Sequence, residues 1–117
     1  MYALLVCEYL GINPTYLFEE DDQGNLTYAH HPFTRPFAED MAFVEERPYD
    51  VRAHAYDIVC NGYELGGGSL RIYDAAMQER VFQLLGMPLE VIRARFGTLL
   101  EAFTYGVPPH GGIAPGI

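Results

Sequence analysis

The chain has 117 residues, half of them apolar, which is enough for one compact domain with a hydrophobic core. Sixteen Asp and Glu residues against seven Lys and Arg residues give a formal net charge of −9, which argues against a segment that binds nucleic acid on its own. The apolar runs are too short to span a membrane, the first residues lack a basic export signal, and the two cysteines and four histidines lack the spacing of a zinc site. We therefore expect a reduced, cytoplasmic protein without a membrane partner.

The N-terminal third predicts short strands and loops. Residues 2–9 form an apolar stretch that fits a strand or a short helix, and we favour the strand. An acidic turn at residues 21–25 divides the β-prone stretch 16–29 into two arms, which predicts a hairpin. Residues 32–48 contain three prolines and four acids, so we expect a loop there with at most a short helical turn near residues 40–43.

Asn61-Gly62 is the strongest hairpin signal, because a type I′ turn needs positive φ at both central residues. The predicted cross-strand pairs are Cys60 with Tyr63, Val59 with Glu64, and Ile58 with Leu65. Side-chain alternation then places Asp57, Val59 and Glu64 on one face. Two carboxylates at such a short distance repel each other unless water screens their charges or a cation lies between them. The hairpin is therefore either a metal site or an exposed strand face with two solvated acids.

Two helices and a last strand are predicted after this hairpin. Asp74 suits the N-cap of the first helix, and Gly86 suits its end; its apolar residues at helical spacing are Met77, Val81, Leu84 and Leu85. Pro88 suits the first turn of the second helix, in which Gly97 could cause a break and Gly106 a stop. Its expected buried stripe consists of Leu89, Ile92, Phe96, Leu99, Leu100 and Phe103. The predicted strands and helices together indicate an α+β unit, an antiparallel sheet with helices packed on one side.

Five segments of the chain follow the order and spacing of one known family. They are residues 30–34, 62–72, 96–102, 105–112 and 113–117. Together they resemble the C-terminal half of the catalytic domain of bacterial-type aspartyl-tRNA synthetase, a class II synthetase. The resemblance covers roughly residues 28–117, and residues 1–27 resemble the family only loosely. Asparaginyl- and lysyl-tRNA synthetases share the fold, but the combination of His-His-Pro-Phe-Thr with Gly-Gly-Gly-Ser-Leu-Arg-Ile favours the aspartyl family.

The resemblance implies an ATP-dependent ligase that activates L-aspartate to aspartyl adenylate and then transfers the aspartyl group to tRNA. It also implies Mg²⁺ as the ion and a homodimer as the complete enzyme. Residue roles follow where the motifs match: Asp57 and Glu64 for Mg²⁺; Glu64, Gly66, Gly67 and Gly68 for ATP; His30, His31 and Arg71 for aspartate; Glu64 and Arg71 as catalytic residues. For the glycines, a purely structural β-bulge is a rival explanation.

Parity along the strand after the turn raises a further expectation. Glu64 and Arg71 are seven residues apart, so strict alternation would send their side chains to opposite faces, whereas the family role needs both in one pocket. We therefore predict a β-bulge within residues 66–69, which restores a common cleft with Asp57 and turns Leu70 and Ile72 into the core.

The chain also departs from the family pattern. The third signature motif of the family continues beyond Gly-Ile to an acidic residue and an ATP-binding arginine, and the first two motifs and the anticodon-binding domain have no counterpart in this sequence. We expect a fragment of a synthetase, covering residues 1–117 of a partial catalytic domain and inactive alone. The alternatives are a stand-alone, non-catalytic module that binds aspartate or a nucleotide, and a structural domain without a ligand.

Overall fold

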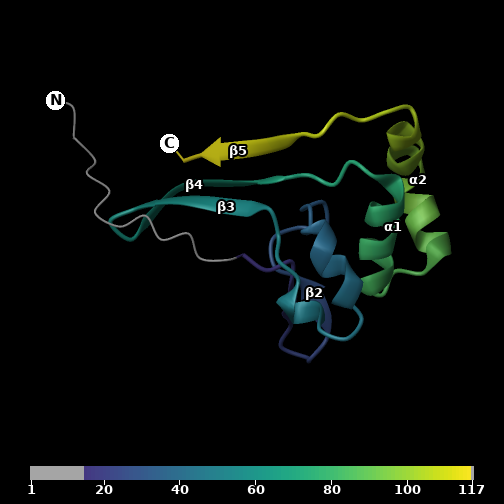
Figure 1. The fold of residues 1–117 in the computed structure, drawn as a ribbon, viewed down its shortest axis with the longest axis horizontal. Helices are drawn as coiled ribbons and strands as arrows, with labels where there is room; N and C mark the ends of the chain where they lie inside the picture. The colour runs from purple at the N-terminus through teal and green to yellow at the C-terminus, as the bar shows by residue number, and fades with distance from the viewer. Residues whose placement is uncertain (1–14, 117) are drawn as a thin grey trace.

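The computed structural model describes residues 15–116, so the strand expected at residues 2–9 lies outside the described residues (Figure 1). The first hairpin joins β1 (Phe18–Glu20) to β2 (Leu26–Tyr28), as predicted. Asp21 forms its turn by accepting hydrogen bonds from the backbone amides of Gln23 (2.9 Å) and Asn25 (2.8 Å). The proline-rich segment that follows contains the 3₁₀-helix η1 (Ala38–Phe43), which is longer than the single short turn predicted near residues 40–43. A second 3₁₀-helix, η2 (Pro48–Asp50), was not predicted.

The main sheet contains β3 (Ala55–Cys60), β4 (Tyr63–Leu70) and β5 (Gly111–Pro115) in antiparallel order. Positive φ angles at Asn61 (50°) and Gly62 (82°) confirm the predicted turn between β3 and β4. Two of the predicted cross-strand pairs are confirmed, but Ile58 pairs with Gly66 and not with Leu65. Leu65 is therefore the extra residue of a β-bulge, and the ladder runs without interruption from Gly66 to Ser69. A bulge exists as predicted, but its predicted range of 66–69 is wrong.

The close approach of β5 explains why the bulge avoids the glycines. A Cβ atom at Gly66 would lie 2.8 Å from the backbone oxygen of Ala114, and one at Gly68 would collide with the backbone oxygen of Gly112. The Tyr56 side chain also lies against Gly68 and donates a hydrogen bond to the Gly112 oxygen (2.6 Å). Gly66 and Gly68 thus permit regular pairing of β4 with β5, and regular pairing leaves no extra residue at this point.

The two helices are α1 (Ala75–Leu84) and α2 (Leu89–Thr104). The Asp74 side chain caps α1 by accepting a hydrogen bond from the Met77 amide (2.8 Å), and positive φ angles at Gly86 (86°) and Gly106 (96°) end the two helices, as predicted. Pro88 is the N-cap of α2 and not part of its first turn. The break expected at Gly97 is wrong, because α2 is continuous through that residue.

The predicted buried residues are only partly confirmed. Ile92 is the only fully buried member of the stripe predicted for α2, and the other five are half-buried. Ile72 is buried (2% exposed), but Leu70 is 38% exposed, so its predicted core position is wrong. The reason is that Leu70 still belongs to the three-stranded sheet, whereas the core lies beyond the end of β4. The core consists of Leu17, Phe18, Met41, Val44, Val51, Ala53, Ile72 and Val81.

The arrangement is the predicted α+β unit of antiparallel sheets and helices. The helices were expected to pack on one side of the sheet, but both lie at one end of the three-stranded sheet, which extends away from them (Figure 1). They are joined through an aromatic cluster, in which the Phe82 and Phe96 rings stack with their centroids 4.4 Å apart and Phe33 contacts both rings edge-on at 6.0 Å. Within residues 15–116, no helix has the length and apolar character needed to cross a membrane.

Candidate functional site

One polar cavity of about 450 Å³ collects most of the predicted site residues. It lies on one face of β3 and β4, beside the segment that follows β2, and it is lined by Asp57, Glu64, His30, His31, Arg71, Gly67 and Gly68. The bulge at Leu65 produces this common face, because it restores the parity between Glu64 and Arg71. Gly66 does not line the cavity, since its Cα faces the backbone of β5.

The two carboxylates meet above Gly67. A Cβ atom at this glycine would lie 2.5 Å from Asp57 Oδ1 and 3.4 Å from Glu64 Oε1, so the missing side chain makes room for both acids. Both residues are exposed, so water screens their repulsion. A pair of carboxylate oxygens with room for phosphate oxygens and waters is a donor set that suits Mg²⁺. Residues 15–116 contain no group of three or more Asp, Glu, His or Cys side chains that could hold a metal ion. A metal at Asp57 and Glu64 would therefore need further ligands.

Arg71 lies at the other end of the cavity. Its Nη1 contacts the Nε2 atom of His31 and donates a hydrogen bond to the Oγ atom of Ser69. The ion pairs formed by the described residues do not include Arg71, so its positive charge is available to an anion in the cavity. Ser69 was not among the site residues predicted from the sequence, although side-chain alternation places it on the Arg71 face, two residues earlier in the chain.

His31 is held in place from two sides. The Phe33 amide lies 3.2 Å from its Nδ1 atom, and the hydroxyl of the buried Thr34 lies 3.3 Å from the same atom. Its Nε2 atom lies 3.4 Å from Ser69 Oγ. Burial, followed by the charges of Arg71 and His30, lowers the pKa of His31 from its ordinary value. The imidazole is therefore neutral near pH 7, and Arg71 supplies the positive charge at this end of the cavity. The contact between Thr34 and His31 was not predicted from the sequence.

A second, apolar cavity of about 430 Å³ lies behind the contact between Arg71 and His31. These two residues line both cavities, and the remaining walls come from Phe33, Ile72, Leu99 and Phe103. Leu99 and Phe103 of α2 therefore face this space, which explains the partial exposure of these two residues. Arg71 and His31 separate a polar cavity from an apolar one.

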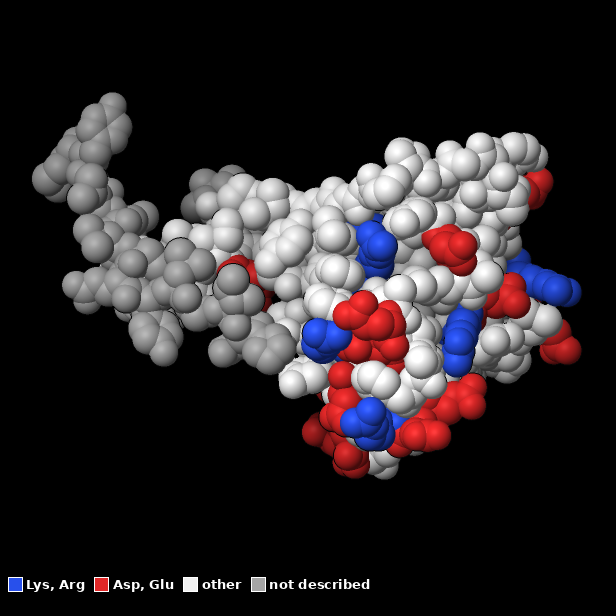
Figure 2. All heavy atoms as spheres, viewed as in Figure 1, with Lys and Arg blue, Asp and Glu red and all other residues white. Residues whose placement is uncertain are grey.

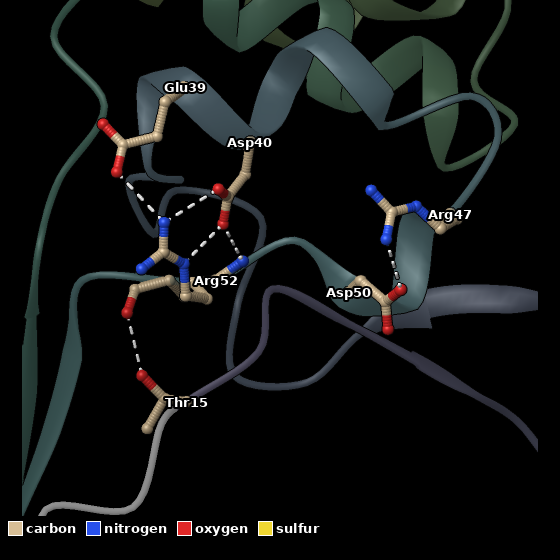
Figure 3. Close-up of polar contacts among 7 residues, drawn as sticks. Thr15, Glu39, Asp40, Arg47, Asp50 and Arg52 are labelled. Carbon is tan, nitrogen blue, oxygen red and sulfur yellow. Dashed lines mark hydrogen bonds and ion pairs between the residues drawn. The ribbon is translucent and has the colours of Figure 1, made fainter.

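A separate polar cluster secures the segment that leads into β3 (Figure 3). The Arg52 guanidinium binds both carboxylate oxygens of the buried Asp40, at 2.8 and 2.9 Å, and also Glu39 at 3.0 Å. The Arg52 amide adds a further hydrogen bond to Asp40 (3.0 Å), and these hydrogen bonds from Arg52 lower the pKa of Asp40 to about 2. None of these residues lines the polar cavity, so the cluster has a structural role.

The surface charges do not form a cationic patch on the face that Figure 2 shows. Blue arginine side chains occur singly among red acidic ones, and the edge along β5 is largely white. Three arginines are paired with acids, namely Arg47 with Asp50 (3.6 Å), Arg52 with Glu39 (3.0 Å) and Arg80 with Glu45 (3.7 Å). Such a face does not provide the clustered cations that bind a phosphate backbone.

Comparisons with known proteins agree on one family. A family model described as tRNA synthetases class II (D, K and N) matches residues 3–117. An aspartate–tRNA ligase from Lysinibacillus sphaericus (strain C3-41) is 59% identical over 110 residues, and an aspartate–tRNA(Asp/Asn) ligase from Bacillus cytotoxicus is 54% identical over 110 residues. Each alignment covers 93% of this chain but 19% of the relative, so the chain spans about a fifth of the length of these ligases.

The fold also matches a solved structure. A crystal structure from Leishmania major Friedlin, assigned as an aspartyl-tRNA synthetase, superimposes with a TM-score of 0.54 over 75% of this chain and 15% of that protein. The two sequences are 24% identical, so this likeness concerns the fold alone.

Proposed function

The chain belongs to the class II tRNA synthetases of the D, K and N group, and on this basis we propose that its polar cavity is part of the active site of an aspartate–tRNA ligase. In such a ligase, L-aspartate reacts with ATP to form aspartyl adenylate, and the aspartyl group is then transferred to tRNA. The observation that carries the proposal is that Asp57, Glu64 and Arg71 line one cavity, although strict alternation along β4 would have separated them.

Arg71 is the proposed ligand of the aspartate side chain. A guanidinium binds a carboxylate through two parallel charge-assisted hydrogen bonds, and it repels the ammonium group of lysine. Among the amino acids of the D, K and N group, an unpaired arginine therefore favours aspartate. The neutral His31 holds the guanidinium from one side, and His30 forms another part of the cavity wall.

Asp57 and Glu64 are the proposed ligands of a Mg²⁺ ion that accompanies ATP. When bound, Mg²⁺ would neutralise phosphate charge, with phosphate oxygens and waters completing its shell. Gly67 keeps the space between the two carboxylates open, and Gly68 presents bare backbone to the cavity. Gly66 would contribute to pairing with β5 and only indirectly to nucleotide binding.

The chemistry that this cavity would support is attack of the aspartate α-carboxylate on the α-phosphorus of ATP. An oxygen–phosphorus bond forms, the bond to the β-phosphate breaks, and pyrophosphate leaves. The residues of the chain would contribute by positioning: Arg71 would hold the side-chain end of aspartate, while Asp57 and Glu64 would hold the Mg²⁺ ion that neutralises the phosphates. The net charge of −9 and the paired arginines favour tRNA contacts outside this segment, in a complete, dimeric and cytoplasmic ligase.

Replacement of Arg71 tests the proposal. We would replace the matched 110-residue segment of the Lysinibacillus sphaericus ligase by the corresponding part of this chain. In this chimera, Arg71→Lys is expected to raise the KM for aspartate about 30- to 150-fold, because a bidentate charge-assisted contact contributes about 2–3 kcal/mol. The KM for ATP should change less than about threefold. Both constants come from aspartate-dependent exchange of pyrophosphate into ATP.

The matched control is Arg80→Lys, which alters an arginine on α1 that pairs with Glu45 outside the polar cavity. It is expected to leave both KM values unchanged. An unaltered KM for aspartate in Arg71→Lys would show that Arg71 is not the aspartate ligand.

A further inference from the structure

Gln78 on α1 is an unusual residue for a protein core. Its side chain is completely buried, with 0% of its surface exposed. The Nε2 atom donates a hydrogen bond to the Pro32 backbone oxygen (2.9 Å), but the buried Oε1 atom has no hydrogen-bond partner among the described residues. An unsatisfied buried acceptor costs free energy, so methionine or leucine would suit this position better if only core packing mattered. A residue that breaks a core rule in this way indicates a functional demand.

Pro32, whose carbonyl oxygen accepts this hydrogen bond, directly follows His31 in the sequence. Proline has no N–H group, so the backbone at Pro32 is secured through its carbonyl oxygen. The following residues run antiparallel to the end of β4, because the Ile72 amide donates to the Phe33 oxygen (2.9 Å) and the Arg35 amide donates to the Leu70 oxygen (2.9 Å). The segment is thus held by β4 after Pro32 and by α1 at Pro32 itself.

His31 in turn contacts Arg71. Its Nε2 side lies against Arg71 Nη1 and Ser69 Oγ, and the opposite ring nitrogen, Nδ1, lies 3.2 Å from the Phe33 amide. The Pro32 carbonyl and the Phe33 amide belong to one planar peptide group, so a shift of that carbonyl would move the amide that lies 3.2 Å from His31 Nδ1, and with it the imidazole. Small displacements of groups that position a substrate have large kinetic effects.

We propose that Gln78 is a positioning residue for aspartate binding: its hydrogen bond from α1 to the Pro32 carbonyl sets His31 against Arg71. The inference rests on the proposed function, and it adds a residue that touches neither the polar nor the apolar cavity. The hydrogen bond from Gln78 also links α1 to the part of the site that would bind aspartate. The helix would therefore contribute to the site as well as to the core.

Gln78→Met in the chimera tests the inference, since methionine has a similar length but no hydrogen-bond donor. We expect the KM for aspartate to rise about tenfold, the effect of one lost hydrogen bond, with the KM for ATP changed less than about twofold. The unfolding midpoint of the 117-residue chain should change little, because the substitution removes the unsatisfied Oε1 atom but leaves the Pro32 oxygen without its donor. Gln83→Met, at an exposed position on the same helix, is the matched control and should change none of these values.

A double-mutant cycle identifies the route of the effect. If Gln78 acts through His31, Gln78→Met should have no further effect on the KM for aspartate in a His31→Ala background. In the 117-residue chain, Gln78→Met should also move the pKa of His31 upward toward its ordinary value, as followed by NMR titration, because the ring loosens from Arg71 and from its buried position.

The outcomes separate this inference from the proposed function. An effect of Arg71→Lys on the KM for aspartate without an effect of Gln78→Met would overturn the positioning role and leave the function intact. No effect of Arg71→Lys would overturn the function itself. If Gln78→Met and Gln78→Leu both failed to fold, Gln78 would be a structural residue and the inference would be wrong.

Discussion

The three consecutive glycines of β4 are each approached closely by other atoms, but the atoms that approach them differ. Gly67 faces the cavity, where a side chain would collide with Asp57, whereas Gly66 and Gly68 lie against the backbone of β5. A run of glycines in a sequence shows that the backbone is approached closely, but it does not show by what. The three glycines therefore differ in position: Gly67 lies between the carboxylates, Gly68 lies against β5 and also lines the cavity, and Gly66 lies against β5 alone.

Glu64 provides the clearest test of the acidic pair. Glu64→Gln keeps the size of the side chain but removes the charge that a Mg²⁺ ligand needs. In the chimera, we expect the rate of adenylate formation to fall at least about a hundredfold, because a lost metal contact weakens charge neutralisation on the phosphates. Single-turnover measurements of adenylate formation would check this.

The stability of the same variant is the second readout. Glu64 is exposed, so Glu64→Gln should change the free energy of unfolding by less than about 1 kcal/mol. Glu101→Gln, an exposed position on α2, is the control that should alter neither rate nor stability. If Glu64→Gln unfolded the chain, its carboxylate would be structural and the metal role would fail.

At the scale of the elements, the features predicted from sequence were those determined within a few residues. The turn at Asn61-Gly62, the cap at Asp74 and the stops at Gly86 and Gly106 are confirmed, because each depends on the φ preference or side chain of one or two residues. These local signals were sufficient to predict most of the element order.

Features that depend on distant segments were misplaced or missed. The position of the bulge depends on how closely β5 approaches β4, and the exposure of Leu70 depends on where the core ends. Thr34 and Gln78 acquire their roles from contacts with His31 and Pro32, which a single sequence does not pair. The resemblance to a family supplied the site residues, whereas spacing alone left two solvated acids as an equal explanation.

The ion pair between η1 and the segment before β3 should make the stability of the chain depend on pH. Arg52 lowers the pKa of Asp40 to about 2, below its ordinary value of 3.8. A carboxylate with a lowered pKa stabilises the folded state above the unfolded pKa, and the contribution is lost as the pH falls toward the folded pKa. Thermal stability should therefore decrease between about pH 4 and pH 2.

Asp40→Asn is expected to remove most of that pH dependence and to lower the melting temperature at pH 7 by roughly 5 °C. Calorimetry of the 117-residue chain at a series of pH values is the measurement. Asp50→Asn is the control, because its pair with Arg47 is exposed on both sides and should contribute little. An unchanged profile in Asp40→Asn would show that other acids cause the acid sensitivity.

At the scale of the whole molecule, the charge of the cavity limits what the chain can do alone. The polar cavity has one arginine and two carboxylates among its lining residues, while the triphosphate of ATP is strongly anionic. Positioning and charge neutralisation provide most of the catalysis in phosphoryl chemistry. We therefore expect the 117-residue chain to catalyse aspartate-dependent pyrophosphate exchange at least about 10⁴-fold more slowly than the chimera.

Contamination by the synthetase of the expression host needs its own control. The chain carrying Glu64→Gln, prepared in the same way, should show the same residual exchange as the unaltered chain if that exchange comes from the host. A rate within about a hundredfold of the chimera, and sensitive to Glu64→Gln, would show that the chain is catalytically competent by itself.

The single extra residue at Leu65 also constrains how this part of the sequence can change in length. On either side of Leu65, successive side chains of the strand alternate between the two faces of the sheet. The extra residue shifts this alternation by one position. A deletion or insertion of one residue in β4 between Glu64 and Arg71 would turn the arginine away from the acids. Two such changes together would restore it. Homologous chains should therefore differ in length here only by even numbers of residues, even where the residues themselves vary.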